Sequence, residues 1–555
     1  MGGEVDAYLS FRLFILKWRR CQKGYSPICK LLTDACIIAR MRRYLYFTVF
    51  ISGMTALAAE FGASRLLQTI YGSSNLVWAS IIGLIMVYFA AGYSLGGRWA
   101  DRSPGPRTLF TILAWGAFSL GIVPFIAGPV LRLAAAAFDV LSLGVVLGSF
   151  AGTLVLFSIP VTLMAMTSPF AVRLLIHDPA KAGEISGRVS SISTMGSVLG
   201  AFLPSLFLFS LIGTTLTFLL FSGILLVVAL YGLWRTAGWK VVLPFLLMPL
   251  LLLTFAWLND YRIKSTPGQV YEVESDYNYI EVLQSGDSML LRLNEGQGVH
   301  SQYNPGQLFY GGPWEEFLVG PMFNGSFSVE GVQRIAIVGL AAGTTARQAT
   351  AVYGDIPIDG YEIDPQIGEV GRKYFGMTMP NLNVYVGDGR WGLEHSPYQY
   401  DLIVVDAYRP PYIPPHLTTQ EFFKICAEHL SEQGVLAINI GRAPQDRRLI
   451  NDLSATIQTV LPSTHVMDIP YTFNSILYAT KQPTTVDSLG ANLMALKAAS
   501  QAPALLVTAA QVAFDNLQPG PNGGEVYTDD RSPVEWVTNS LVINFILGGG
   551  VETIQ

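Results

Sequence analysis

Residues 334–346 read RIAIVGLAAGTTA, and this stretch decides the fold of the second half of the chain. The run RIAIVG is apolar and has the length of a buried strand, and a helix is expected from Thr344. A glycine loop that opens a helix lets the backbone approach a nucleotide-like ligand. The spacing Gly339-x-x-x-Gly343 is not the dinucleotide pattern, so the loop alone is a weak indication.

Strand-like runs alternate with helical segments on the C-terminal side of this loop. This alternation predicts a parallel, doubly wound sheet that binds its ligand at the carboxyl ends of the strands. The further strands expected are 358–364, 383–388, 401–407 and 434–440, and the runs 464–469 and 474–480 extend the sheet.

Carboxylates follow three of these strands. Glu362 lies 23 residues after Gly339, a distance suited to an acid that binds ribose hydroxyls. Asp388, followed by Gly389, ends the next strand, where an acid can accept from an adenine amino group. Each acid alone could equally be a helix cap or a turn residue, but together with the glycine loop they favour an adenosine ligand. No phosphate-binding Lys-Ser/Thr motif is present, so a triphosphate is not expected.

A third acid, Asp406, stands where the strand DLIVVDA stops, and a loop with four prolines follows it. Upstream, residues 270–293 contain two strand-like runs, YNYIEVLQ and MLLRLN, divided by the turn 285–288. This pattern predicts a small β-unit in front of the parallel sheet.

The first half of the chain is much more apolar. Charged residues make up only 14% of the 555 residues and the mean hydropathy is +0.40, which exceeds that of an ordinary soluble protein. Because a transmembrane helix needs about 20 apolar residues, we predict seven spans. They are residues 44–63, 76–97, 108–127, 143–166, 190–212, 214–234 and 240–258.

The basic residues are distributed unevenly around these spans. Lysine and arginine favour the cytoplasmic side, which places the N-terminus inside and, with seven spans, the C-terminal half outside. The richer side holds Arg40, Arg42, Arg43, Arg98, Arg102, Arg107, Arg173, Lys181, Arg188, Arg235 and Lys240, and the poorer side holds Arg65, Arg132, Arg262 and Lys264. This orientation conflicts with a cofactor drawn from the cytoplasm, which requires either a different span count or a failure of the charge rule.

Composition excludes some classes of function. The net charge of −5 and the lack of a basic tract with aromatic residues argue against nucleic-acid binding. The spacing of the four cysteines fits no metal site, and unpaired structural thiols are the simplest interpretation.

These motifs resemble those of the spermidine synthase family of polyamine aminopropyltransferases, in the bacterial form that carries a multi-span membrane domain. The resemblance covers most of 44–480 and includes Glu60-x4-Arg65, the run 187–203 and the late motif 528–535. It implies four parts: a basic tail (1–43), a membrane domain (44–260), a small β-domain (261–331) and a methyltransferase-like, Rossmann-like α/β domain of the S-adenosylmethionine type (332–555).

The resemblance also implies an activity and a set of site residues. The expected reaction moves the aminopropyl group of decarboxylated S-adenosylmethionine to a diamine such as putrescine, without a metal. Gly339, Gly343 and Gly389 would shape the cofactor site, Glu362 would hold the ribose and Asp388 the adenine. Asp406 would be the catalytic acid, and the loop 408–415 a gate over the amine. The expected partners are a small amine and a lipid bilayer, with a homo-oligomer left open, and the expected location is a bacterial membrane with a cytoplasmic catalytic domain.

The amine half departs from the family pattern. The position three residues after Asp406, where the family has a second acid, holds Arg409, which follows Tyr408. Tyr277–Asn278 replaces Tyr-Gln, Trp314–Glu315–Glu316 replaces Tyr-His-Glu, and Ala341–Ala342 replaces an acid-bearing loop. Glu315, Glu316 and Glu295 are candidates to compensate at the amine site.

Two other functions are compatible with the same residues. An S-adenosylmethionine-dependent methyltransferase could use the same sheet, with Arg409 binding an acidic substrate or the carboxylate of the intact cofactor. A catalytically degenerate domain could instead serve a membrane assembly or transporter.

Overall fold

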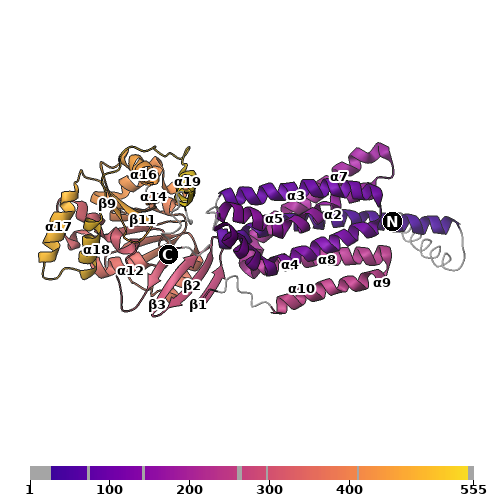
Figure 1. Cartoon of the computed structure of the whole chain (residues 1–555), viewed down its shortest axis with the longest axis horizontal. Coiled ribbons are helices and arrows are strands. Elements are labelled where there is room, and N and C mark those ends of the chain that lie inside the picture. The colour runs from indigo at the N-terminus through magenta and orange to yellow at the C-terminus, as the bar shows by residue number, and fades with distance from the viewer. Residues whose placement is uncertain are drawn as a thin grey trace, which may run out of the picture.

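The computed structural model contains a bundle of long helices and an α/β part with two sheets (Figure 1). The helices run side by side, and both sheets lie at one end of the bundle (Figure 1). The structure describes residues 27–71, 75–139, 144–258, 266–294, 298–408, 412–444 and 446–547.

Seven helical segments in the described chain are long and apolar enough to cross a membrane, in agreement with the seven predicted spans. They are Met41–Gln68, Val77–Arg102, Pro106–Leu131, Gly148–Leu175, Pro179–Leu208, Leu211–Ala237 and Trp239–Leu258. Helix α2 (Pro27–Tyr71) begins within the range assigned above to a basic tail, so Arg42 and Arg43 belong to the first helix.

The remaining helices of the bundle follow with short connections. They are α3 (Asn75–Arg102), α4 (Pro106–Asp139), α5 (Gly144–Ala165), α6 (Thr167–Leu175), α7 (Ala182–Leu203), α8 (Phe209–Ala237), α9 (Trp239–Val242) and α10 (Leu247–Leu258), with the turns η1 (Pro179–Lys181), η2 (Pro204–Leu208) and η3 (Leu243–Leu246). The turn η2 is a π-helical widening between α7 and α8.

Small residues allow α2 and α7 to pack backbone to backbone. A Cβ atom added at Gly196 would lie 2.1 Å from the carbonyl oxygen of Phe50, and one at Gly200 would lie 2.0 Å from that of Met54. Ser197 donates a hydrogen bond of 3.2 Å to the carbonyl oxygen of Gly53. The glycine and serine positions of the fifth span therefore serve close helix packing.

We expect Gly200→Ala to destabilise the protein by about 1–3 kcal/mol, because the added methyl group overlaps the backbone of α2. The measurement is the unfolding temperature of the purified protein in detergent. Gly187→Ala on the same helix is the matched control, since a Cβ there meets nothing within 4 Å. Equal unfolding temperatures for the two variants would contradict the close packing of these helices.

The small β-unit is an antiparallel sheet in the order β1-β2-β3-β4. Its strands are β1 (Gln269–Glu274), β2 (Tyr279–Ser285), β3 (Ser288–Leu293) and β4 (Val299–Tyr303). The two inner strands, β2 and β3, are the two predicted runs. The outer strands were not predicted, because they alternate with polar residues and are only partly buried.

The larger sheet has seven strands in the order β10-β11-β9-β8-β5-β6-β7. They are β5 (Ile335–Val338), β6 (Ile358–Glu362), β7 (Leu382–Val386), β8 (Tyr400–Val405), β9 (Leu430–Gly441), β10 (Ser463–Asp468) and β11 (Asn474–Thr480). The strands β5 to β9 pair in parallel as predicted, whereas β11 is antiparallel to both of its neighbours. This arrangement is that of a Rossmann-like, methyltransferase-like sheet.

Helices cover both faces of this sheet. Alternate residues of β5 enter different cores: Ile335 and Ile337 pack in one cluster with α12 (Thr344–Tyr353), and Ala336 and Val338 in the other. The other helices and turns are α11 (Pro313–Glu316), η4 (Phe317–Phe323), η5 (Val329–Gly331), α13 (Pro365–Tyr374), α14 (Gly389–Glu394), η6 (Pro415–Leu417), α15 (Gln420–His429), α16 (Arg448–Gln458), α17 (Val486–Ala498), α18 (Ala504–Asp515) and α19 (Val534–Leu547).

The strand order reverses direction at β5. The chain runs from β5 outward to β6 and β7, and then returns to place β8 on the other side of β5. In open α/β sheets the ligand binds in the crevice at such a switch point, outside the carboxyl ends of the strands. The topology therefore predicts a ligand site at the residues that follow β5 and β8.

Candidate active site

The glycine loop between β5 and α12 packs against the end of β8. Gly339 has a φ of +89°, and a Cβ there would lie 2.6 Å from the backbone nitrogen of Ala407. Gly343 has a φ of +83°, and a Cβ there would lie 2.7 Å from Met377. Both positions thus favour glycine. Gly339 lets the end of β8 approach the loop, and Gly343 leaves space for the side chain of Met377.

Glu362 ends β6 and its carboxylate holds the glycine loop. Its Oε2 accepts from the backbone nitrogen of Ala341 at 2.9 Å, and its Oε1 accepts from that of Asp364 at 3.1 Å. Burial raises the pKa of Glu362 to about 7, although these backbone hydrogen bonds oppose the shift. The carboxyl group therefore changes charge near neutral pH, within reach of whatever binds the loop.

Asp388 follows β7 and has two local partners. Its Oδ1 accepts from the backbone nitrogen of Trp391 at 2.9 Å, so it caps α14, and its Oδ2 lies 2.9 Å from Nε2 of His416. Gly389 sits against β5, because a Cβ there would lie 2.6 Å from Val338. The helix-cap interpretation of Asp388 is thus correct, and the carboxylate still lies at the carboxyl edge of the sheet.

Asp406 follows β8 at the switch point. Its backbone nitrogen donates to the carbonyl oxygen of Val338 at 2.9 Å, and its Oδ1 accepts from Nδ2 of Asn439 at 2.9 Å. Burial raises the pKa of Asp406 to about 7, and the hydrogen bond from Asn439 opposes the shift. A carboxyl group with this pKa can take up and release a proton at neutral pH.

Asn439 holds the carboxylate of Asp406, and Tyr408 in turn holds the backbone of Asn439. The hydroxyl of Tyr408 donates to the carbonyl oxygen of Asn439 at 3.1 Å, and burial raises the pKa of this tyrosine. Asn439 is 5% exposed and its Oδ1 has no hydrogen-bond partner within the described chain. An unused acceptor therefore lies on the residue that orients the Asp406 carboxylate. Arg409 and the first two prolines of the predicted gate lie outside the described residues.

Tyr277 and Asn278 occupy the loop between β1 and β2. Asn278 donates to Asp364 Oδ2 at 3.0 Å and accepts from Asn294 at 2.9 Å, so its amide is held in a polar network. The side chain of Tyr277 is 44% exposed. This network ties the β-unit to the segment that follows β6.

The structure does not bring Glu315 and Glu316 to the same place. Glu315 is fully buried and accepts hydrogen bonds from three successive backbone nitrogens, those of residues 310–312, and from Gln348. Glu316 is 1% exposed, and burial together with the charge of Glu315 raises its pKa well above the usual value. Their placement supports a structural role in holding the loop before α11, in place of the compensating role expected from the sequence. Glu295 lies outside the described residues.

A single pocket of about 530 Å³ collects most of the predicted site. From the sequence-predicted set it is lined by Gly339, Glu362, Asp388, Gly389, Asp406, Tyr408, Tyr277 and Asn278, whereas Gly343, Glu315 and Glu316 are not among its lining residues. Its volume lies within the range of small-molecule sites. The cofactor-type acids and the proposed catalytic acid thus face one common space.

Several lining residues were not predicted from the sequence. His416 and His300 belong to the pocket, and burial lowers the pKa of His300 to about 4, which keeps it neutral. The helical bundle contributes a further set of lining residues: Phe61, Ser64, Arg65, Gln68, Trp78, Ser205 and Phe209. Among these bundle residues, only Arg65 could have been predicted from the sequence, because it is a charged residue at the end of a span.

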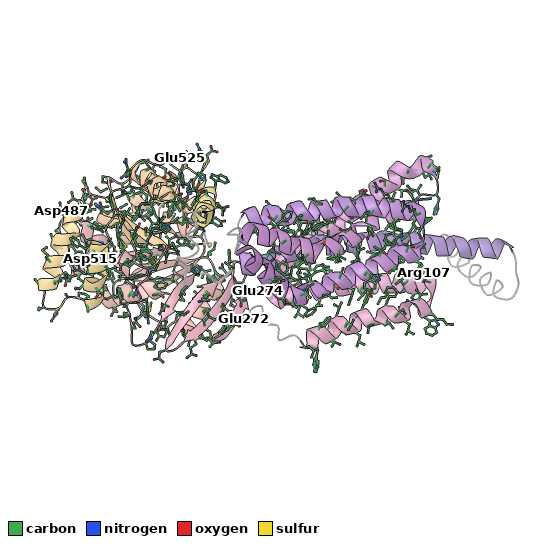
Figure 2. The ribbon with its side chains drawn as sticks, viewed as in Figure 1. Arg107, Glu272, Glu274, Asp487, Asp515 and Glu525 are labelled. Carbon is green, nitrogen blue, oxygen red and sulfur yellow. The ribbon has the colours of Figure 1, made fainter. Side chains whose placement is uncertain are left out.

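Hydrogen bonds fix this wall of the bundle against the β-unit. Arg65 donates to the carbonyl oxygens of Ser275 at 2.7 Å and Asp276 at 3.2 Å. Glu274, which lies at the junction in Figure 2, accepts from the backbone and the hydroxyl of Thr214, both at 3.0 Å. The loop that carries Tyr277 is therefore held from the side of the helices.

The described residues contain no group of three histidine, cysteine or carboxylate side chains that could hold a metal ion.

Sequence comparison finds similar proteins for part of the second half. The profile of the spermine/spermidine synthase domain matches residues 325–487. The Bifidobacterium longum protein named "Probable polyamine aminopropyl transferase" is 31% identical over 283 residues, 48% of this chain and 61% of the relative. The polyamine aminopropyltransferase of Vibrio vulnificus is 32% identical over 142 residues, 25% of this chain and 46% of the relative. The chain thus spans less than two thirds of the length of these relatives.

A comparison with solved structures gives a similar set of names. The structure titled as a probable spermidine synthase from Corynebacterium glutamicum has a TM-score of 0.37 at 20% identity, and covers 47% of this chain and 96% of its own. The matched range 325–487 contains Gly339, Glu362, Asp388 and Asp406. Residues 325–487 in the C-terminal half match the spermine/spermidine synthase domain, and a bundle of seven long apolar helices precedes them in the sequence.

Proposed function

We propose that the protein is a membrane-anchored polyamine aminopropyltransferase, which moves an aminopropyl group from decarboxylated S-adenosylmethionine to an amine. The observation that carries this proposal is the position of Asp406, with a pKa of about 7, in the same pocket as the glycine loop and Glu362. The residues present fit the co-substrate: Gly339 lines the pocket at the loop, Glu362 offers a carboxylate for ribose hydroxyls, and Asp388 lies at the neighbouring strand end.

The proposed reaction requires an uncharged amine. An alkylamine has a pKa of about 10, so at neutral pH it arrives as an ammonium ion that cannot attack. The Asp406 carboxylate attracts this cation and accepts its proton. The amine lone pair then forms a bond to the carbon that is attached to the sulfonium sulfur. The bond between this carbon and the sulfur breaks, its electron pair stays on the sulfur, and neutral methylthioadenosine leaves. Asn439 holds the carboxylate in one orientation during this step.

The test is a product analysis of the full-length protein in detergent or nanodiscs. With decarboxylated S-adenosylmethionine and an amine, we expect release of methylthioadenosine at a rate that depends on both substrates. Formation of adenosylhomocysteine from intact S-adenosylmethionine would assign a methyltransferase instead. Failure to bind either nucleoside would remove both enzymatic functions and favour a non-catalytic domain.

We also propose that the catalytic half faces the cytoplasm, because a permanently charged sulfonium nucleoside does not cross a bilayer unaided. The distribution of basic residues opposes this placement. Arg107 lies at the end of the bundle away from the sheets (Figure 2). The other loops that are rich in lysine and arginine alternate with the poorer loops along the chain, so they lie at the same end as Arg107. Such loops favour the cytoplasm. The two arguments make opposite predictions for one measurement.

Cysteine labelling separates them. With the native cysteines replaced by serine, Tyr471→Cys reports on the catalytic half, because Tyr471 is fully exposed, and Arg107→Cys reports on the opposite end. In intact spheroplasts we expect a membrane-impermeant maleimide to label Arg107→Cys and to reach Tyr471→Cys only after permeabilisation. The reverse pattern would place the catalytic half outside.

A further inference from the structure

The wall of the pocket opposite the sheet is built by the ends of four segments of the bundle. Phe61 and Arg65 come from α2, Trp78 from α3, Ser205 from η2 and Phe209 from α8. Phe61 and Trp78 form an edge-to-face pair with centroids 6.5 Å apart. Three aromatic rings therefore face the same space as Asp406, although they lie at least 197 positions earlier in the sequence.

The charge on this wall is positive. The guanidinium of Arg65 lies 5.4 Å from the ring of Phe209 and donates to two backbone carbonyls, which fixes its position. An ammonium group placed beside it would be repelled, more strongly in a partly buried pocket than in water. The other polar side chains that the bundle places on this wall are uncharged, and the buried hydroxyl of Ser205 has no partner within the described chain. The exposed residue Asp276 also lines the pocket, from the loop between β1 and β2.

We infer that the bundle forms the acceptor half of the active site and that the acceptor is a primary amine with an apolar tail. This inference rests on the proposed function for the role of Asp406, which binds the amine nitrogen. The tail would lie against Trp78, Phe61 and Phe209, where burial of apolar surface favours binding. The membrane helices thus select the substrate as well as anchoring the enzyme.

The test compares two acceptors of equal length that differ in one charge, n-hexylamine and 1,6-diaminohexane. Their dissociation constants are measured by titration calorimetry on full-length protein in nanodiscs saturated with methylthioadenosine, with empty nanodiscs as the blank. We expect hexylamine to bind at least about tenfold more tightly, because its far end meets aromatic rings and a cation. Equal or tighter binding of the diamine overturns the inference.

A pair of tryptophan variants locates the tail. We expect Trp78→Ala to weaken hexylamine about tenfold and Trp99→Ala to leave it unchanged, because Trp99 is on the same helix, is 45% exposed and does not line the pocket. Equal effects of both variants would contradict the assigned wall. The comparison of the two amines on the wild type does not depend on either variant folding.

The outcomes also separate this inference from the proposed function. If hexylamine binds preferentially but no amine supports release of methylthioadenosine, the proposed aminopropyl transfer is refuted and the inference about the acceptor wall is supported. Transfer with a preference for diamines would keep the function and overturn the wall. In that case Glu60 is the next candidate, because its Oε2 has no partner in the described chain and it lies one turn from Ser64 on α2; Glu60→Gln should then abolish the preference.

Discussion

The Asp406→Asn protein should bind methylthioadenosine as the wild type does and release it from decarboxylated S-adenosylmethionine about 10²–10⁴-fold more slowly. The replacing amide can still accept from Asn439 and has nearly the same shape, so the pocket should persist. It cannot take a proton from an ammonium ion. Turnover measured at saturating co-substrate, together with calorimetric binding of methylthioadenosine, separates the two effects.

Asp401→Asn is the matched control, because Asp401 stands at the opposite end of β8 and accepts from the backbone of Gln333, away from the pocket. Its turnover should stay within about twofold of the wild type. The pH profile adds a second check. Since only ionised Asp406 accepts a proton and its pKa is about 7, the wild-type rate should rise with pH through about 7. Turnover of Asp406→Asn within tenfold of the wild type would contradict the assigned role.

The parts of the fold that could be predicted are those with long, uniform apolar patterns. The seven spans are such runs, and so are β5, β6, β8 and most of β9, whose residues are buried within the sheet. The edge strands β1 and β4 were missed because apolar and polar residues are mixed along them and most of their side chains are only partly buried. The antiparallel insertion of β11 could not be inferred either, since its sequence NSILYAT is as apolar as that of a parallel strand.

The site divides in the same way. Glu362, Asp388 and Asp406 could be anticipated because parallel strands bring their carboxyl ends to one edge. Asn439 left only the faint signal of one amide within an apolar strand. Trp78 and Phe209 gave none, because an aromatic residue at the end of a span is an ordinary interfacial residue until the tertiary fold places it beside a catalytic acid. Glu315 was placed at the amine site from its motif position alone, which gives no information on burial, and the structure has it buried and outside the pocket lining.

Glu362→Gln should weaken methylthioadenosine binding about 10–100-fold at pH 8, because a hydrogen bond to a charged group contributes about 1.5–3 kcal/mol. The ionised carboxylate has lone pairs for ribose hydroxyls beyond those that accept from Ala341 and Asp364. The amide has one oxygen for all of them. The measurement is titration calorimetry, with the unfolding temperature recorded to show that the variant is folded.

The pH dependence of this binding distinguishes a ligand contact from a structural one. Donation from ribose hydroxyls stabilises ionised Glu362, so its pKa of about 7 should fall on binding, and wild-type affinity should decrease between pH 8 and pH 6. Glu362→Gln should lose most of this dependence, and Glu369→Gln, on the exposed side of α13, should retain it. If the two variants bind alike at both pH values, Glu362 only supports the loop, and the ribose must be held by other residues of the pocket.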